Sequence, residues 1–342
     1  MTVRASDAAA FPPSPARAKL PGMFTLAELD AAADLVHAAF APTPSYSWPL
    51  INARAGTEVW VKHENHTPTG SFKVRGGLTY FHRLSKTGLQ PRGVISATRG
   101  NHGQSLAYAG RKAAIPVTIV APHGNSVEKN AAMRAFGATL VEHGHDFDEA
   151  RTYAKALAEE RGLVFAPSFH ADLVVGVATW VLEMARAVPF LDVLYVPIGL
   201  GSGICGAIRT RDLLGLSTEI VGVQSTGAPA YALSLAAGRV VATNRADTRA
   251  DGVATREPDP EAFAIIQSGV ARIVTVTDEA IGEAIRAYWK DTHNLAEGAG
   301  AASLAALLQE RDRIAGRRVG VVITGGNIDL TLFRQWLLDS GP

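Results

Sequence analysis

Four short segments of the sequence combine residue types that could do chemistry. The first, TPTGSFKVRGG (67–77), places Lys73 among small and polar residues at the predicted start of a helix. The positive end of the helix dipole and the nearby cations Lys62 and Arg75 disfavour a protonated amine, so we expect a lowered pKa for Lys73. A neutral lysine amine is what Schiff-base chemistry requires. Most lysines are solvated surface residues, so this segment alone is a weak signal.

The second and third segments are typical of anion-binding turns. SATRGNHGQS (96–105) predicts a turn into a helix whose first backbone N–H groups point outward, with Asn101 as a further amide donor. PIGLGSGICG (197–206) has closely spaced glycines before a helix, so its backbone can approach a phosphate. It is neither the Walker pattern nor a clean GxGxxG fingerprint, because Gly199, Gly201 and Gly203 are more tightly spaced and the segment lies late in the chain. This pattern favours a small phosphate monoester over a dinucleotide. The alternative for the second segment is an ordinary turn into a helix with Asn as its cap. The alternative for the third segment is a flexible glycine turn.

The fourth segment, VVITGGNID (321–329), ends a predicted strand at Thr324, whose hydroxyl is free to meet a ligand. The two glycines that follow Thr324 allow a flat ring to come close. A lesser segment, HNLAEGAGA (293–301), places Glu297 at a helix start, where its carboxylate could equally serve only the helix dipole.

Each of the four segments follows a predicted β-strand. Strand-like runs alternate with amphipathic helical segments, which predicts parallel βαβ units in open sheets. Ligands of such sheets bind beyond the carboxyl ends of the strands. Thr25 and Glu28 form a capping box for a helix near the N-terminus. The predicted strands are 58–64, 94–98, 117–122, 138–143, 164–168, 193–197, 219–225, 272–278 and 318–326, and the clearest predicted helices are 101–114, 126–136, 146–161 and 279–292.

The composition bounds the class of protein. A chain of 342 residues with 47% hydrophobic residues can bury a sizeable core in one large or two joined domains. A net charge of +1 gives no reason to expect nucleic acid or a membrane surface as a partner. The single cysteine, Cys205, excludes an internal disulfide and suits a reducing cytosol, and we expect it to be a buried thiol. Residues 1–24 lack a secretory signal and predict a mobile arm, so we expect a cytoplasmic protein.

Taken in this order, the four segments resemble the fold-type II pyridoxal-phosphate (PLP) enzymes, most closely the threonine/serine dehydratase–serine racemase group. SFKVRG, GNHGQ and TGGNID carry the resemblance, which extends from about residue 43 to residue 338. It implies an α/β fold like the tryptophan synthase β-subunit, with two open twisted αβα domains. The large PLP-binding domain would comprise residues 25–89 plus 169–342, and a small mobile domain would comprise residues 90–168.

The resemblance also implies a role for each site residue. Lys73 would hold the PLP aldehyde as a Schiff base and, once displaced by the substrate amine, would remove the Cα proton. Phe72 would pack beside the ring, Asn101 would bond its phenolic oxygen and Thr324 would face its pyridine nitrogen. The backbone amides that would cradle the phosphate belong to Gly199, Leu200, Gly201, Ser202 and Gly203. The turn that would take the substrate carboxylate comprises Thr98, Arg99, Gly100, Asn101 and His102.

The resemblance predicts a PLP-dependent ammonia-lyase that converts a 3-hydroxy L-amino acid of the threonine/serine type to a 2-oxo acid and ammonia by β-elimination. A neutral hydroxyl at Thr324 would leave the ring nitrogen largely unprotonated, so the carbanion would be short-lived and loss of the β-hydroxyl could compete. The alternatives are threo-3-hydroxyaspartate, a phenylserine-type substrate and a hydroxyectoine-derived amino acid. The expected partners are the amino-acid substrate and further copies of the chain in a homodimer or higher homo-oligomer, and the expected setting is amino-acid catabolism.

The chain departs from the family pattern at three places. Arg99 stands where relatives usually carry Ser or Ala; it stays protonated, which disfavours racemisation, and could instead bind a second carboxylate or turn outward to solvent. Gln224 and Ala230 stand where the family's divalent-cation site has acidic residues, so we expect no metal there. The sequence ends soon after TGGNID, so we expect no C-terminal regulatory domain like that of the biosynthetic threonine dehydratases and no feedback inhibition through it.

Three other functions are alternatives. A racemase or β-replacement enzyme would use the same cofactor, but the chain has GNHG where a cysteine-synthase relative has a Thr-containing turn. A non-catalytic binding protein would need Lys73 to be incidental. A nucleotide-dependent oxidoreductase would need GxGxxG after the first strand. The sequence leaves the substrate side-chain pocket open, with candidates at Ser45, Trp48, His123, Ala228 and Tyr231.

Overall fold

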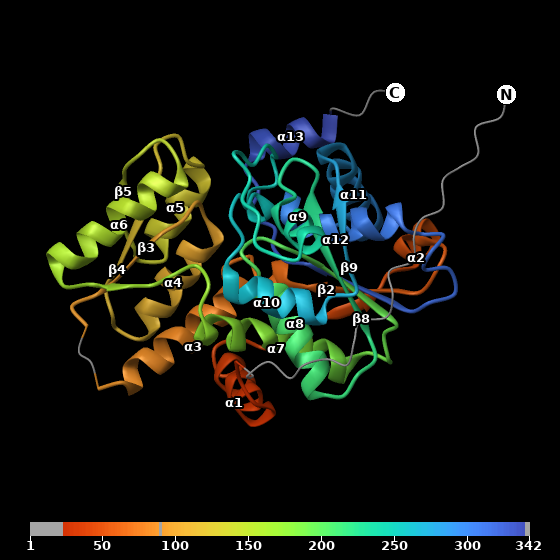
Figure 1. Cartoon of the computed structure of the whole chain (residues 1–342), viewed down its shortest axis with the longest axis horizontal. Helices are drawn as coiled ribbons and strands as arrows, with labels where there is room; N and C mark the ends of the chain where they lie inside the picture. Colours follow the sequence, from red (N-terminus) through yellow and green to blue (C-terminus); the bar gives the residue numbers. More distant parts are fainter. Residues whose placement is uncertain (1–22, 89–90, 339–342) are drawn as a thin grey trace.

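Two β-sheets organise the chain, which the computed structural model describes at residues 23–88 and 91–338 (Figure 1). The larger sheet has the strand order β1-β2-β10-β7-β8-β9 and the smaller one the order β5-β4-β3-β6. Every strand pair is parallel except β1 with β2. The strands are β1 (Ser45–Ser47), β2 (Val59–His63), β3 (Val94–Ala97), β4 (Val117–Ala121), β5 (Thr139–Glu142), β6 (Val164–Phe165), β7 (Val193–Pro197), β8 (Glu219–Ser225), β9 (Arg272–Val276) and β10 (Val319–Ile323).

Helices connect nearly all of these strands. They are α1 (Leu26–His37), α2 (Pro49–Ala55), α3 (Lys73–Lys86), α4 (Asn101–Lys112), α5 (Val127–Ala135), α6 (Phe147–Arg161), α7 (Ala171–Ala187), α8 (Ser202–Leu213), α9 (Ala230–Ala237), α10 (Pro260–Gly269), α11 (Asp278–Thr292), α12 (Gly298–Gln309) and α13 (Leu330–Leu338), with 3₁₀ turns η1 (Glu64–His66) and η2 (Asp251–Val253). The α/β class predicted from the sequence is confirmed, and all nine predicted strands are present. The strand that sequence reasoning missed is β1, a three-residue antiparallel edge strand without an apolar run.

The larger sheet is covered by helices on both faces. Along β10, Val321 belongs to an apolar cluster that includes Leu304 of α12 and Ile285 of α11. Its neighbour Val322 belongs to a second cluster, formed largely by residues of α7 and α8. Successive side chains of a strand point to opposite faces, so a strand buried on both sides must be apolar throughout. The nearly continuous apolar runs in the sequence have this cause.

The smaller sheet forms its own lobe with α4, α5 and α6 (Figure 1). Val94 of β3 packs toward α3 and α4, and Ile95 packs toward α6. Helix α3 contacts both α4 and α7, so it joins the two lobes. The four strands of this lobe lie between residues 94 and 165. The domain boundaries at residues 90 and 168 stay a prediction.

A buried cluster of charged side chains lies beside α3. The Arg75 guanidinium is fully buried and forms two-pronged hydrogen bonds to Glu64 (2.7 and 2.9 Å) and to Glu183 (2.5 and 2.9 Å). Lys62 Nζ donates to Glu183 at 2.6 Å. The two cations and the two carboxylates balance, as buried charges must. The cluster ties α3 to β2 and α7.

The N-terminal capping box is present as predicted, with Thr25 and Glu28 bonded to each other's backbone N–H groups. The predicted mobile arm, 1–24, lies outside the described residues except for its last two positions, and Phe24 there is buried. Within the described ranges, no helix is long and apolar enough to cross a membrane.

Candidate active site

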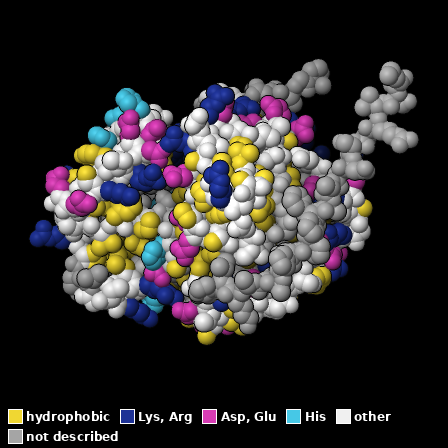
Figure 2. Space-filling model, viewed as in Figure 1, with side chains coloured by type: hydrophobic (Ala, Val, Ile, Leu, Met, Phe, Trp, Pro, Cys, Tyr) yellow, Lys and Arg dark blue, Asp and Glu magenta, His cyan; other side chains and the backbone are white. Residues whose placement is uncertain are grey.

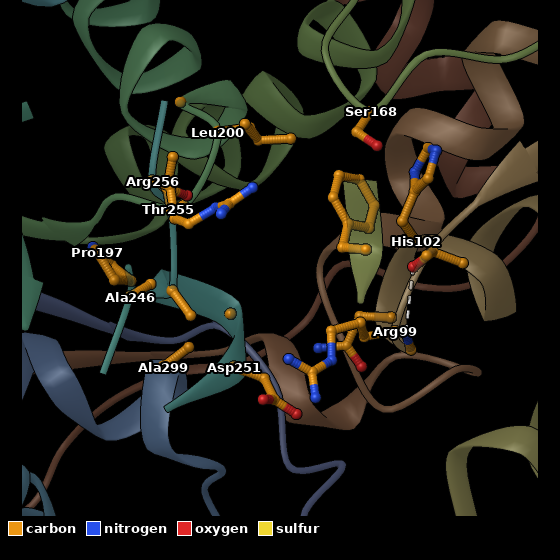
Figure 3. A pocket seen from close by; sticks show the side chains of 18 of the residues that line it. Arg99, His102, Ser168, Pro197, Leu200, Ala246, Asp251, Thr255, Arg256 and Ala299 are labelled. Carbon is orange, nitrogen blue, oxygen red and sulfur yellow. Dashed lines mark hydrogen bonds between the residues drawn. The ribbon is translucent and has the colours of Figure 1, made fainter. Parts of the chain in front are cut away.

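The residues predicted to bind the cofactor and the substrate carboxylate all line one cavity between the two lobes. The cavity has a volume of about 710 Å³ (Figure 3). Helices α3, α4 and α8 begin at its wall, so their N-terminal backbone N–H groups surround it. The predicted residues on the wall are Phe72, Lys73, Thr98, Arg99, Gly100, Asn101, His102, Gly199, Leu200, Gly201, Ser202, Gly203 and Thr324.

Lys73 is the first residue of α3, and its amine enters the cavity. Lys73 Nζ donates to Ser202 Oγ at 3.0 Å and lies 5.1 Å from the centre of the Phe72 ring. Burial lowers the pKa of Lys73 to about 8, against a smaller opposing effect of Glu297. The pKa is lowered, as predicted, but Lys62 and Arg75 are not the cause. Lys62 and Arg75 are neutralised in the buried cluster, and desolvation of the amine does the lowering.

The glycine-rich segment joins β7 to α8. Gly201 has φ of +106°, a conformation that favours glycine, and forms the N-cap of α8. A Cβ at Gly199 would collide with the carbonyl oxygen of Gly252 in η2. Gly199 is therefore required for the packing of η2 over the loop. Tyr231 supports the loop from behind, where its hydroxyl donates to the Leu200 carbonyl at 3.0 Å.

The turn before α4 forms the opposite wall. The backbone N–H of Gly100 donates to Thr98 Oγ1 at 3.1 Å, which fixes the turn. A Cβ at Gly100 would come within 2.6 Å of the Lys129 side chain. His102 is buried, and burial lowers its pKa to about 3, so its ring is neutral near pH 7. A proton-transfer role for His102 has no support in this environment.

Asn101 belongs to a hydrogen-bond network that the sequence did not reveal. Asn101 Nδ2 donates to Glu297 Oε1 at 2.5 Å, and Asn101 Oδ1 accepts from Asn327 Nδ2 at 2.8 Å. Asn327 Nδ2 also donates to the Thr69 carbonyl at 2.8 Å. Burial raises the pKa of Glu297, and Lys129 and Asn101 oppose that shift. Glu297 is thus part of the cavity wall rather than a carboxylate that serves only a helix dipole.

The end of β10 is joined to the segment that carries the lysine. Phe72 N donates to the Thr324 carbonyl at 2.9 Å, and Gly326 N donates to the Gly70 carbonyl at 2.9 Å. Ser71 and Gly325 form an isolated β-bridge between them. These contacts hold Thr324 and Lys73 on the same side of the cavity.

Sequence reasoning missed a charged rim. Lys129 of α5 contacts Asp251 of η2 at 3.3 Å, and Arg256 forms an ion pair with Asp148 of α6. The segment between α9 and α10 carries Asp251 and Arg256 and lines the cavity (Figure 3). Its sequence has no strand or helix pattern, so only a run of charges between residues 245 and 257 could have drawn attention to it.

The candidates for a substrate side-chain pocket are not on the cavity wall: Ser45, Trp48, His123, Ala228 and Tyr231. Gln224 Oε1 accepts a hydrogen bond from Ala232 N at 2.9 Å, so this side chain binds the first turn of α9.

Cys205 is fully buried, and burial raises the pKa of its thiol, as expected for an unreactive cysteine.

The fold and the cavity define a class of enzyme, the α/β enzymes of fold type II, which bind PLP between two open sheets. Residues 36–325 match the family described as pyridoxal-phosphate dependent enzyme, and the chain belongs to that family. The prediction of PLP as the cofactor is thereby confirmed.

The chain is also similar to individual relatives and to solved structures. The chain is 34% identical to the L-threonine ammonia-lyase of Thermotoga maritima, over 83% of this chain and 70% of the relative. It is 31% identical to an L-threo-3-hydroxyaspartate ammonia-lyase from a Pseudomonas species, over 86% of this chain and 92% of the relative. The structure of processed threonine deaminase isoform 2 from Solanum lycopersicum superposes with a TM-score of 0.85 at 29% identity, over 98% of this chain and 99% of that one.

Proposed function

We propose that this enzyme removes the β-hydroxyl of a 3-hydroxy L-amino acid and releases a 2-oxo acid and ammonia. It is a PLP-dependent ammonia-lyase of the hydroxyamino-acid type, as the sequence predicted. The proposed roles rest on the position of Lys73. Its amine lies in the same cavity as the glycine-rich loop that ends at Ser202 and as the turn before α4.

The residues of the cavity fit PLP. The N-terminal backbone N–H groups of α8 would hold its phosphate, because a helix N-terminus favours an anion. The close packing of Gly252 leaves no room for a side chain at Gly199. Thr324 would present a neutral hydroxyl to the ring nitrogen. When bound, PLP supplies an electron sink for the carbanion at Cα.

Lys73 would act twice. A neutral amine is the nucleophile that attaches the cofactor, and the pKa of about 8 makes this form accessible near neutral pH. After the substrate amine takes its place, Lys73 Nζ would remove the Cα proton. Ser202 Oγ, 3.0 Å away, would keep the freed amine in position.

The turn before α4 would bind the substrate carboxylate. The first backbone N–H groups of α4 have no partner within the helix and point into the cavity wall formed by Thr98 to His102. Asn101 would also bond the phenolic oxygen of the cofactor, with its orientation set by Glu297 and Asn327. These contacts would fix the Cα proton toward Lys73.

We further propose that the enzyme works in the cytoplasm, in amino-acid catabolism, as a homodimer or higher homo-oligomer. The buried thiol of Cys205, the only cysteine, supports a reducing compartment. Light scattering of the purified enzyme measures its molar mass in solution. The mass of a monomer would contradict the proposed homodimer or higher homo-oligomer. We also propose that the lobe of α4, α5 and α6 moves as a unit to close over the substrate.

The test of the activity is release of 2-oxo acid and ammonia in equal amounts from L-threonine and L-serine. Lys73→Ala should abolish the visible absorption of the bound cofactor and lower turnover at least about a thousandfold. Lys86→Ala, at the other end of the same helix and outside the cavity, is the matched control and should keep both. Racemised substrate without 2-oxo acid would contradict the proposal.

A further inference from the structure

The cavity wall beside the turn before α4 carries a cation without a partner. Arg99 lines the cavity, and among the described residues its guanidinium has no hydrogen bond or ion pair. Its side chain is exposed to the cavity rather than packed in the core. In Figure 3, Arg99 reaches into the cavity toward Asp251. An arginine held in an active-site cavity without a partner is a candidate binding group for an anion.

The other cations of this region are mostly held by carboxylates. Lys129 lies 3.3 Å from Asp251 and 3.9 Å from Glu297. Asp251, the carboxylate toward which Arg99 points, is therefore already paired with Lys129. Asp148 pairs with Arg256 and, at 3.1 Å, with Arg151. The three cations and the three carboxylates of these pairs balance, so none of the pairs neutralises the charge of Arg99.

A second arginine on the wall, Arg245, also has a guanidinium with no hydrogen bond or ion pair among the described residues. It belongs to the segment between α9 and α10 and is exposed there. Arg99 is the stronger candidate because its own backbone is part of the turn that would hold the substrate carboxylate. The side chain of a substrate held at this turn lies within the reach of an arginine from the same turn.

We infer that Arg99 binds a second carboxylate on the substrate, so that the preferred substrate is a 3-hydroxy amino dicarboxylic acid. This inference rests on the proposed function, since it assumes that the turn before α4 holds the α-carboxylate. The planar guanidinium offers two parallel N–H donors, which match a carboxylate and do not match a methyl or phenyl group. With an uncharged substrate side chain, closure of the cavity would leave the guanidinium desolvated and unpaired.

The first experiment compares kcat/KM of the PLP-loaded enzyme for L-threo-3-hydroxyaspartate, L-threonine and L-serine. We expect hydroxyaspartate to be favoured at least about tenfold, the effect of one charge-assisted hydrogen bond. Arg99→Ala should lower kcat/KM for hydroxyaspartate, mainly through KM, by about ten- to a hundredfold more than it lowers the value for threonine. Arg99→Lys keeps the charge without the fork and should be intermediate. Arg92→Ala, an exposed arginine outside the cavity, is the matched control.

The second experiment needs no turnover. Calorimetry measures binding of succinate and butyrate, which have the same chain length but differ by one carboxylate, to the loaded enzyme. The wild type should bind succinate at least about tenfold more tightly, and Arg99→Ala should remove the difference. Equal binding of the two acids by the wild type would overturn the role of Arg99.

The two proposals fail in different ways. If threonine or serine is turned over best and Arg99→Ala leaves the order of substrates unchanged, the inference is wrong while the proposed function stands. If the loaded enzyme releases no 2-oxo acid from any of the three amino acids, the proposed function is wrong, and the comparison of succinate with butyrate still decides whether Arg99 binds a second carboxylate.

Discussion

Lys73 and Ser202 are 129 residues apart in the chain, yet the amine of one donates to the hydroxyl of the other at 3.0 Å. Each is the first residue of its helix, so the N-termini of α3 and α8 meet at this contact. Two helix N-termini that converge on one point give a site that favours an anion and disfavours an ammonium group. The same arrangement that would hold the cofactor phosphate therefore also favours the neutral form of the lysine.

The pH dependence of cofactor attachment should report the pKa of Lys73. Attachment requires the neutral amine, and burial lowers the pKa of Lys73 to about 8. The rate of PLP attachment to the cofactor-free enzyme should therefore rise with pH and level off above about 8, whereas an ordinary lysine would level off only above about 10.4. The rate is measured by stopped-flow absorbance. Since the negative charge of Glu297 opposes the lowering, Glu297→Gln should move the inflection to lower pH. An inflection near pH 10 in the wild type would contradict the buried position of the amine.

Gly199 should tolerate no side chain. In Gly199→Ala the new methyl group would meet the carbonyl oxygen of Gly252, so η2 or the loop must shift. We expect at least about a tenfold loss of PLP affinity, since displaced backbone donors lose charge-assisted hydrogen bonds. Gly203→Ala is the milder change in the same loop, because its methyl group would lie 3.7 Å from Phe72 and Val196. Fluorescence titration with PLP measures both, and equal affinities would show that the steric argument is wrong.

Arg75 should matter for stability rather than for chemistry. Arg75→Met would leave the buried carboxylates of Glu64 and Glu183 without their main partner. Breaking a buried ion pair in this way costs about 3–5 kcal/mol of unfolding free energy. Arg83→Met, on the same helix but at solvent-exposed ion pairs with Glu28 and Asp172, should cost about 1 kcal/mol or less. Urea unfolding followed by circular dichroism gives both values, and similar losses for the two variants would refute the distinction.

Asn101 should affect turnover without affecting folding. Its amide bonds Glu297 and Asn327 on the cavity wall, and in the proposed mechanism it also bonds the cofactor. Asn101→Ala should shift the absorption maximum of the bound cofactor and lower kcat about tenfold or more. The urea midpoint should stay close to that of the wild type. Asn125→Ala removes a buried amide pair with Asn130 away from the cavity, so it should leave the absorption maximum unchanged. Unaltered kcat and spectrum in Asn101→Ala would remove this residue from the site.

The sequence predicted the strands because most of them are buried on both faces, as at Val321 and Val322, and a doubly buried strand must be a continuous apolar run. It predicted the site residues on the turns because glycines and cap residues there have narrow conformational roles, as Gly201 shows. It could not predict Lys129 or Asp251, since a single charge in an irregular segment carries no local pattern. Their meeting at 3.3 Å depends on how two lobes face each other, and that relation has no signature at short range in the sequence.

The position of β10 has a consequence for how the protein is made. This strand lies between β2 and β7 in the larger sheet, so two strands that are synthesised much earlier cannot be joined until residues 319–323 have left the ribosome. Until then, β2 and β7 each present an open edge, which is a template for association with other chains. Thr324 and the bridge between Ser71 and Gly325 arrive with the same strand. A nascent chain therefore cannot complete its cofactor site during most of translation. Chaperones that shield strand edges should influence the yield of folded enzyme more than an early supply of PLP.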